Sequence, residues 1–329
     1  MRKMVSIFEN SGLVIANERS NEISDRLSQY FEKVFKHLPE NTQRAYLGDM
    51  NDFSAWCDRV NEIGLTQSAS KNEQIIEHYF AELMQSTLAL STIDRRLSSL
   101  SVFLDISGWP NPLKTSSLLR AHIKVTKRDK TQYQDQAYPL QLEFITQLNK
   151  ITDETKPLEV RDRLIVNIMY DCLLRASELC NILLNDIDVR KQTLHLKWSK
   201  TDQEGAGSYR FISNTTLDLI AHWREKYNVS NGYLVRKLSP KQTIQSDGVN
   251  YMSVYHTFKR ITEKLGIKQS ISTHSARVGS AVDMAENNID ILAIQRSGGW
   301  KSLSMPARYT AQANAMKSGA SEVAKIFNR

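Results

Sequence analysis

The chain has 329 residues, of which 41% are hydrophobic and 24% charged, and this composition predicts a soluble globular protein with two domains. No apolar run approaches the roughly 20 residues of a membrane helix, and the N-terminal residues lack the apolar stretch of a signal peptide. We therefore expect a cytoplasmic protein that does not bind a membrane. The net charge is +7, and its surplus lies in residues 138–329, with 26 basic and 19 acidic residues, whereas residues 1–137 have 17 of each. A basic balance favours a nucleic-acid partner but does not require one.

The three cysteines and seven histidines give no sign of a metal site. Cys57, Cys172 and Cys180 have no metal-ligand spacing, and each lies among apolar neighbours, as small core residues do. A sparse, odd cysteine count is typical of a reducing compartment. The sequence also has no glycine-rich nucleotide loop, so it predicts neither a metal nor another cofactor.

The N-terminal part of the chain is predicted to be helical. Residues 1–20 lack periodicity and are expected to form a flexible arm, and residues 21–123 are expected to form an all-α domain. Apolar spacing and turn signals predict its helices over residues 24–36, from Pro39 through Trp56, 72–86, from Ser91 to Gly108, and 112–123.

Residues 124–137 are basic and polar and have almost nothing to bury, so they predict either an extended linker or a solvated surface loop. We place the domain boundary there. The remaining residues, 138–329, predict a mostly helical domain with a small antiparallel sheet. Its helices are expected near 140–150, 158–172, 175–184, 215–227, 251–265, 275–287 and 290–297, and its strands near 186–189, 193–198 and 209–212.

The C-terminal segment 319–328 predicts a short amphipathic helix. Its apolar residues Val323, Ile326 and Phe327 would either dock into a neighbouring subunit or pack on their own domain.

Cationic residues in the second domain suggest the chemistry of a metal-free attack on a phosphodiester. The transition state carries extra negative charge on its non-bridging oxygens, which the planar guanidinium groups of Arg175 and Arg277 can bind. His274 lies three residues before Arg277, so both project the same way on a helix, and an imidazole can accept a proton. Lys200 lies next to the turn of the predicted sheet, where it could protonate a leaving oxygen.

Two aromatic residues complete the set. Trp300, in Gly-Gly-Trp, offers an indole N–H donor, and Tyr309 offers a phenol that can form a covalent phosphotyrosine bond. Each residue alone is more often structural: an arginine or lysine at the surface, a tryptophan or tyrosine in packing. The ordered set and its spacing favour the catalytic interpretation.

This set resembles the tyrosine recombinase (phage integrase) family. The resemblance covers residues from about 24 to the end, and it depends on Leu-Leu-Arg-Ala-Ser-Glu, Thr-His-Ser-Ala-Arg-Val-Gly, Gly-Gly-Trp and the segment around Tyr309. It implies that Arg175, His274 and Arg277 activate the scissile phosphate, that Lys200 protonates the 5′-hydroxyl, and that Tyr309 is the nucleophile. Trp300, where many members carry histidine, would hydrogen-bond the phosphate, and Glu178 would support the site. The stretch between Arg175 and Lys200 is shorter than in the most similar members, which weakens the assignment of Lys200.

The resemblance also implies the fold and the activity. We expect an N-terminal helical bundle, the SAM-like core-binding domain, and a mainly helical α+β catalytic domain with a small antiparallel sheet. The enzyme would cleave and rejoin double-stranded DNA at inverted-repeat sites through a 3′-phosphotyrosine, as a homodimer on one site and a homotetramer in synapsis, in a bacterial, plasmid or phage setting. The alternatives are a type IB topoisomerase-like enzyme and a non-catalytic DNA-binding factor derived from a recombinase.

Several basic and polar side chains on predicted helices and loops are candidates for DNA contacts, although each could equally be a solvated surface residue. They are Arg44, Thr92, Arg95, Arg96, Lys127, Arg236, Lys237, Tyr255 and Lys259.

Overall fold

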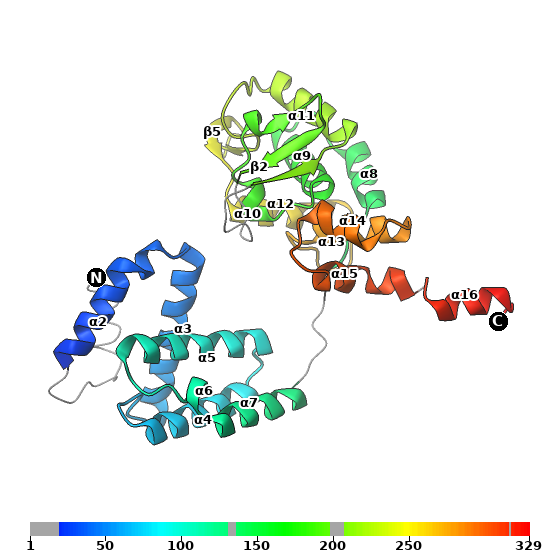
Figure 1. Cartoon of the computed structure of the whole chain (residues 1–329). Coiled ribbons are helices and arrows are strands. Elements are labelled where there is room, and N and C mark those ends of the chain that lie inside the picture. The colour runs from blue at the N-terminus through cyan, green and yellow to red at the C-terminus, as the bar shows by residue number, and fades with distance from the viewer. Residues whose placement is uncertain (1–19, 131–135, 198–206, 316) are drawn as a thin grey trace. The chain divides into compact units, whose positions relative to one another are not determined.

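The computed structural model describes residues 20–130, 136–197, 207–315 and 317–329, and the chain divides into two compact units, Met1–Gln134 and Asp135–Arg329 (Figure 1). We call them the N-terminal and C-terminal units. Both are mainly helical, and the strands are confined to small antiparallel sheets, which confirms the predicted fold class. The expected arm, up to residue 19, lies outside the described residues.

The N-terminal unit is an all-α bundle in which α5 packs against α2, α3 and α4. Its elements are α2 (Ser20–Lys33), η1 (Phe35–His37), α3 (Glu40–Val60), α4 (Ala69–Gln85), α5 (Leu90–Ser107), α6 (Pro112–Thr115) and α7 (Ser117–Asp129).

Aromatic and branched side chains fill the centre of this bundle. Phe53 of α3 is fully buried and meets Tyr79 of α4 edge to face, with ring centroids 5.1 Å apart. Ile93 and Leu104 of α5 close the core from the other side. Each such burial is worth about 1.5–3 kcal/mol, so the helices depend on one another for stability.

The expected linker is wrong over its first half, because α7 continues to Asp129. The helix is anchored by buried Leu119 and Ile123. Its polar end is held by Lys127, which forms an ion pair with Asp94 of α5. Polarity alone therefore did not mark the end of the helix, since a packed first half can extend a helix through a solvated second half. Residues 131–135 of the expected linker lie outside the described residues.

The C-terminal unit surrounds helix α9 with further helices and two small sheets. Its elements are α8 (Leu142–Ile151), α9 (Pro157–Asp171), α10 (Ala176–Leu179), η2 (Leu184–Asp186), β1 (Ile187–Asp188), β2 (Thr193–Leu196), β3 (Ser208–Phe211), α11 (Asn214–Lys226), β4 (Arg236–Leu238), β5 (Ile244–Gly248), α12 (Tyr251–Lys264), α13 (Ser275–Glu286), α14 (Ile291–Gly298), α15 (Ser304–Ala315) and α16 (Gly319–Ile326).

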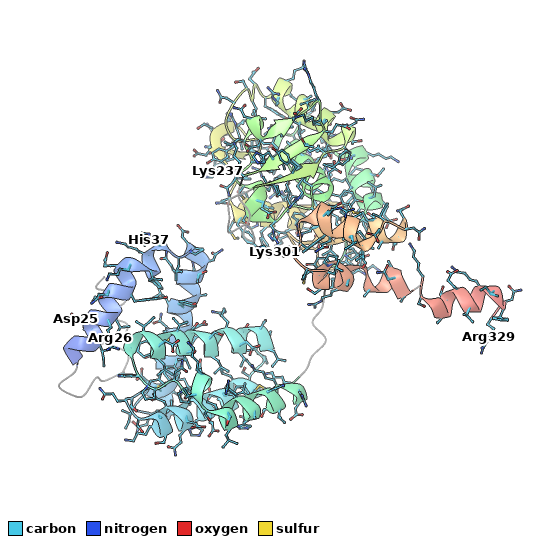
Figure 2. All side chains as sticks on the ribbon, viewed as in Figure 1. Asp25, Arg26, His37, Lys237, Lys301 and Arg329 are labelled. Atoms are coloured by element: carbon cyan, nitrogen blue, oxygen red, sulfur yellow. The ribbon has the colours of Figure 1, made fainter. Side chains whose placement is uncertain are left out.

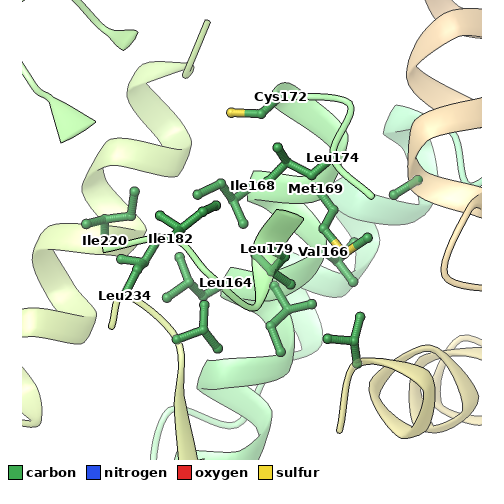
Figure 3. Close-up of a cluster of buried hydrophobic side chains, with 14 of the residues drawn as sticks. Leu164, Val166, Ile168, Met169, Cys172, Leu174, Leu179, Ile182, Ile220 and Leu234 are labelled. Carbon is green, nitrogen blue, oxygen red and sulfur yellow. The ribbon is translucent and has the colours of Figure 1, made fainter. Parts of the chain in front are cut away.

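Helix α9 is buried along most of its length. Figure 3 shows Leu164 and Ile168 of this helix among side chains of the surrounding elements, including Ile220 of α11 and Leu234. Trp223 of α11 is fully buried and donates its indole N–H to the Leu234 carbonyl at 3.0 Å. The segments that carry the candidate site leave this core at the end of α9 and at the start of α13, so its packing fixes their positions.

The C-terminal unit contains two small antiparallel sheets. Strand β2 lies between β1 and β3 with the register Leu194 opposite Arg210, and β4 pairs with β5. Strands β4 and β5 and helix α15 were not predicted.

The helix expected over residues 175–184 is also wrong in its second half, because α10 ends at Leu179. The next residues run extended against another segment, with the Leu234 amide donating to the Ile182 carbonyl and the Leu184 amide to Gly232, both at 2.9 Å. This long-range pairing outweighs the local helical pattern.

Candidate active site

The first part of the candidate site is the turn between α9 and α10. Leu173, 1% exposed, adopts a left-handed conformation with φ of 49°, which turns the chain sharply after α9. Arg175 follows at the N-cap of α10. Buried Glu178 accepts the Arg175 amide at 2.8 Å and its Nη1 at 2.6 Å. The carboxylate thus orients the backbone and the side chain of Arg175 together.

Helix α13 supplies the second part. His274 is its N-cap residue and Arg277 lies in its first turn, as the three-residue spacing predicts. Arg277 is 2% exposed and donates to two backbone carbonyls, those of Leu173 and, at 2.8 Å, Gly298. Its guanidinium therefore ties the α9–α10 turn to the end of α14.

The third part is the segment from the end of α14 into α15. Gly299 is the C-cap of α14 with φ of +62°, a left-handed conformation that favours glycine. Trp300 follows, and the centroid of its ring lies 4.2 Å from the guanidinium carbon of Arg277. Tyr309 of α15 contacts the same indole edge to face, with centroids 5.9 Å apart. The structure thus brings together Arg175, Glu178, His274, Arg277, Trp300 and Tyr309.

Charge and burial set the protonation of this cluster. Burial, together with the charge of Arg175, lowers the pKa of Arg277 to about 10, so this guanidinium remains charged at neutral pH. Desolvation by the surrounding protein, followed by the charges of Arg277 and Arg175, lowers the pKa of His274, although its residue surface is exposed. The imidazole is therefore neutral near pH 7 and able to accept a proton. Burial raises the pKa of Tyr309 against the opposing effect of nearby arginines, which keeps the phenol protonated.

Arg210 of β3 is a member of this neighbourhood that the sequence analysis did not select. Its charge acts on Arg277, and the charge of Glu178 acts on it. The expected Lys200 lies outside the described residues, on the connection between β2 and β3.

The amino-acid sequence was compared with known families. Residues 140–316 match the profile described as "Phage integrase family", and residues 27–107 match "Phage integrase, N-terminal SAM-like domain". The first match alone spans more than half of the chain. The chain belongs to the phage integrase family. It is a tyrosine recombinase, an enzyme of DNA cleavage and rejoining.

Individual relatives agree with this assignment. An "Integrase/recombinase xerD homolog" of Selenomonas ruminantium is 27% identical over 99% of this chain and 97% of its own length. "Recombinase cre" of Escherichia phage P1 is 24% identical over 94% of each chain. Among solved structures, XerH bound to a palindromic difH substrate has a TM-score of 0.64, with 17% identity over 98% of this chain and 94% of that one. A lambda integrase dimer bound to a core site has a TM-score of 0.59, with 15% identity over 88% and 94%. These structural likenesses show a shared fold.

The recombinase carries its first group of predicted DNA contacts on α3 and α5. Arg44 is exposed, and Arg95 lies beside it, since Arg95 Nη1 approaches the Ala45 carbonyl at 3.3 Å. Arg95 also pairs with buried Asp49 at 2.6 Å, and this pairing fixes its direction. Thr92 is half-buried on the same helix.

Arg96, another candidate for a DNA contact on α5, is much less exposed than Arg95. Its side chain is 18% exposed and forms an ion pair with Asp52 of α3. Both arginines of α5 are thus held against α3, Arg95 by Asp49 and Arg96 by Asp52.

The second group lies mostly on the C-terminal unit. Tyr255 and Lys259 are exposed and one turn apart on α12, so they share a face. The Arg236 side chain donates to the Asn231 carbonyl, in the segment that precedes β4, and the partly exposed Lys237 follows it on β4 (Figure 2). Lys127, on the N-terminal unit, is engaged with Asp94.

Among the described residues, no group of three or more histidine, cysteine, aspartate or glutamate side chains has the geometry to hold a metal ion. Likewise, no described helix is long and apolar enough to cross a membrane.

Proposed function

We propose that this chain is a site-specific recombinase that cleaves and rejoins double-stranded DNA at inverted-repeat sites through a 3′-phosphotyrosine intermediate, without metal or ATP. The observation that carries the proposal is the convergence of Arg175, His274, Arg277, Trp300 and Tyr309 from three separate segments onto one site. Chance rarely brings two guanidinium groups, an imidazole, an indole donor and a phenol together in this way. Relatives are named recombinase and integrase, and the similar Tn1549 transposon integrase was solved in complex with DNA, which supports the substrate class.

The chemistry follows from these groups. The Tyr309 oxygen attacks the phosphorus, a new P–O bond to the phenol forms, and the bond to the 5′ oxygen breaks. The phenol proton passes to neutral His274, and Lys200 protonates the departing 5′ oxygen. Arg175 and Arg277 bind the non-bridging oxygens, where charge develops. Since one phosphodiester replaces another, rejoining is the same reaction in reverse and needs no energy source.

Trp300 and Glu178 have supporting roles in this reaction. The Trp300 indole is a donor without an acceptor, which suits it to a phosphate oxygen. Glu178 touches no reacting atom in this scheme and orients Arg175.

Assembly on DNA is part of the proposal. We infer one dimer per inverted-repeat site and a tetramer in synapsis, with α16 docking into a neighbouring subunit. Helix α16 has no buried residue among those described, and Val323, Ile326 and Phe327 are 52%, 73% and 69% exposed. Apolar side chains this exposed on one short helix favour a partner. The bacterial and phage relatives also favour a cytoplasmic protein of bacterial, plasmid or phage origin.

The DNA contacts are proposed to differ in kind. Arg95, held rigidly by Asp49, is suited to reading a base edge, whereas Lys127 is suited to a phosphate. Arg95→Ala should relax sequence preference, and Lys127→Ala should weaken binding to all sequences alike. A binding selection on randomised half-sites distinguishes the two, and equal effects on specificity would contradict the assignment.

The test is covalent trapping. Half-sites selected from a randomised inverted-repeat library are presented as nicked suicide substrates in EDTA to the wild type, Tyr309→Phe and Tyr227→Phe. Tyr227 is a suitable control because its hydroxyl has no partner among the described residues. An adduct that survives denaturation in the wild type and Tyr227→Phe, and is absent in Tyr309→Phe, is the expected result. Tight DNA binding without any adduct would favour a non-catalytic DNA-binding factor instead.

A further inference from the structure

Arg210 is a buried cation with few hydrogen-bond partners among the described residues. It is 6% exposed and faces inward from β3, whereas its neighbours Tyr209 and Phe211 are 68% and 60% exposed. Its Nη1 donates to the Tyr209 carbonyl at 3.0 Å, and its Nε meets no acceptor within the described residues. Burying a guanidinium costs free energy unless its donors are satisfied, so the groups that surround Arg210 among the described residues show what the side chain does there.

The guanidinium of Arg210 packs against the backbone of Gly299. A Cβ atom on Gly299 would overlap Nη2 of Arg210 and would lie 2.9 Å from its Cζ and 3.3 Å from Nη1. Gly299 and Trp300 close the end of α14 by donating to the Arg296 and Gln295 carbonyls, both at 3.1 Å. The side chain of Arg210 therefore borders the turn from which Trp300 projects.

Arg277 holds the same turn through the preceding residue. Its Nη2 donates to the Gly298 carbonyl at 2.8 Å, and the Trp300 ring lies so close over Gly298 that a Cβ there would overlap it. The two glycines are thus bordered by two guanidinium groups, one hydrogen-bonded to Gly298 and one packed on Gly299. The negative charge of Glu178 stabilises the charged form of both arginines.

We propose that Arg210 is a positioning residue that fixes the Gly299 turn and thereby holds the indole of Trp300, and the phenol of Tyr309 packed against it, in place for the scissile phosphate. The inference rests on the proposed function, since it assigns Arg210 a part in the same reaction. Arg210 also belongs to the strand that follows the connection bearing Lys200 in the sequence. One side chain thus links that strand to the turn of Trp300.

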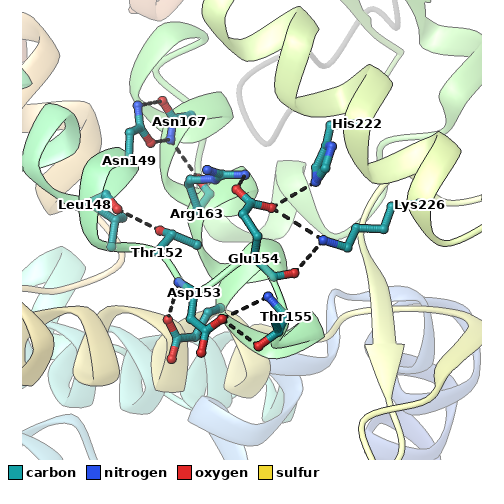
Figure 4. Close-up of polar contacts among 11 residues, drawn as sticks. Leu148, Asn149, Thr152, Asp153, Glu154, Thr155, Arg163, Asn167, His222 and Lys226 are labelled. Atoms are coloured by element: carbon teal, nitrogen blue, oxygen red, sulfur yellow. Dashed lines mark hydrogen bonds and ion pairs between the residues drawn. The ribbon is translucent and has the colours of Figure 1, made fainter.

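The first test needs neither DNA nor activity. Full-length protein labelled with 5-fluorotryptophan is studied by fluorine NMR, and the Trp300 signal is assigned with Trp300→Phe. Arg210→Met should shift or broaden that signal, while the signals of Trp56 and Trp109 report that the N-terminal unit is unchanged. The matched control is Arg163→Met, because Arg163 is also a buried arginine of the C-terminal unit but is bonded to Glu154 beside His222 and Lys226 (Figure 4). An unchanged Trp300 signal in Arg210→Met would overturn the proposal.

The second test measures single-turnover adduct formation on the suicide substrate at saturating DNA, with the dissociation constant measured separately. Arg210→Met should lower the cleavage rate constant by about 10- to 100-fold, which is less than the loss of rate that follows removal of a preorganised hydrogen-bond donor. The affinity for DNA should change by less than about threefold. Arg210→Lys, which keeps the charge but not the planar fork, should be intermediate and remains informative if Arg210→Met does not fold.

The double variant decides whether Arg210 acts through Trp300. If it does, Arg210→Met combined with Trp300→Phe should cleave no more slowly than Trp300→Phe alone. Independent, multiplying losses would refute the positioning role. A wild type that forms no adduct would refute the proposed function, and the fluorine signal of Trp300 would still decide the structural role of Arg210.

Discussion

Gly279 lies where α13 comes closest to the backbone of the neighbouring residues Leu140 and Gln141. A Cβ atom there would overlap the carbonyl group of Leu140 and would lie 2.9 Å from the Gln141 amide nitrogen. These are backbone atoms, which cannot rotate away as a side chain can. The Leu140 amide donates to the Ser275 carbonyl at 2.9 Å, and the Leu142 amide donates to Asp283 at 2.8 Å. The segment is thus bonded to α13 on both sides of Gly279, and it cannot withdraw without losing hydrogen bonds.

We therefore expect Gly279→Ala to destabilise the C-terminal unit by about 1–4 kcal/mol. Overpacking against a rigid neighbour costs about 1–3 kcal/mol, and a broken hydrogen bond adds roughly 1 kcal/mol. Alanine regains at most about 1 kcal/mol through its better helix propensity. Arg277 precedes Gly279 by two residues, so a displaced helix should also slow adduct formation.

Gly48 of α3 provides the matched control. It is likewise a helical glycine, but a Cβ there would meet no atom within 4 Å. Gly48→Ala should therefore stabilise the N-terminal unit by about 0.5–1 kcal/mol and leave the C-terminal unit unchanged. Because a chain of two units need not unfold in one step, we would measure hydrogen exchange of peptides from each unit in increasing denaturant. A Gly279→Ala variant whose C-terminal unit is as stable as that of the wild type would refute the packing argument.

Three further predictions follow from the site. The pKa of His274 is lowered on folding, so the unfolded chain binds a proton more readily, and the free energy of unfolding should fall as the pH drops below the ordinary pKa of 6.5. In denaturant titrations, His274→Asn should remove this part of the pH dependence. Parallel pH profiles of the wild type and His274→Asn would contradict the prediction. Glu178→Gln places an amide where both carboxylate oxygens accept hydrogen bonds from Arg175. It should lower the free energy of unfolding of the C-terminal unit by about 3 kcal/mol in denaturant titrations. A decrease of less than about 0.5 kcal/mol would exclude the orienting role. Truncation at Gly319 should leave half-site binding intact and abolish cooperative assembly in gel-shift titrations, and unchanged recombination would contradict docking by α16.

The helices that the sequence predicts well are those whose burial and local signals agree. Tyr46, Met50, Phe53 and Trp56 recur at helical spacing, and α3 covers all of them. A helix was expected near residues 251–265, and α12 spans Tyr251–Lys264; the structure shows that Asn250 caps its start by accepting the Ser253 amide at 2.9 Å. In such segments propensity, capping and the core favour the same conformation.

The elements that were missed depend on contacts between distant parts of the chain. Strands β4 and β5 have no clear alternation, since most of their side chains are at least partly exposed, and their pairing alone defines them. Helix α15 packs against α13, but its sequence has a weakly apolar face and a proline in its first turn. Local patterns could not separate these segments from loops.

The candidate site was predicted from an ordered set of residues, its spacing and a family resemblance, and Arg210 lies outside that set. The sequence Ser-Tyr-Arg-Phe suggests a strand whose aromatic side chains face inward. The structure has the reverse arrangement, with Tyr209 and Phe211 exposed and Arg210 inside. The sequence signal that could have identified Arg210 is a charged residue in the middle of a short apolar strand. Such an arginine is either exposed or buried with a functional role.

The charges of the site account for this arrangement. Arg175, Arg210 and Arg277 lie in one neighbourhood, and Glu178 is the carboxylate whose charge acts on Arg210 and Arg277. Burial and the charges of the neighbouring arginines lower the pKa of Arg277 to about 10, and among the described residues named here three guanidinium groups share the one carboxylate of Glu178. A bound phosphodiester would supply one negative charge, and the pentacovalent transition state would add another. Because the cations are already in place, their interaction with the second charge needs no reorganisation, and the site should therefore bind the transition state more tightly than the substrate.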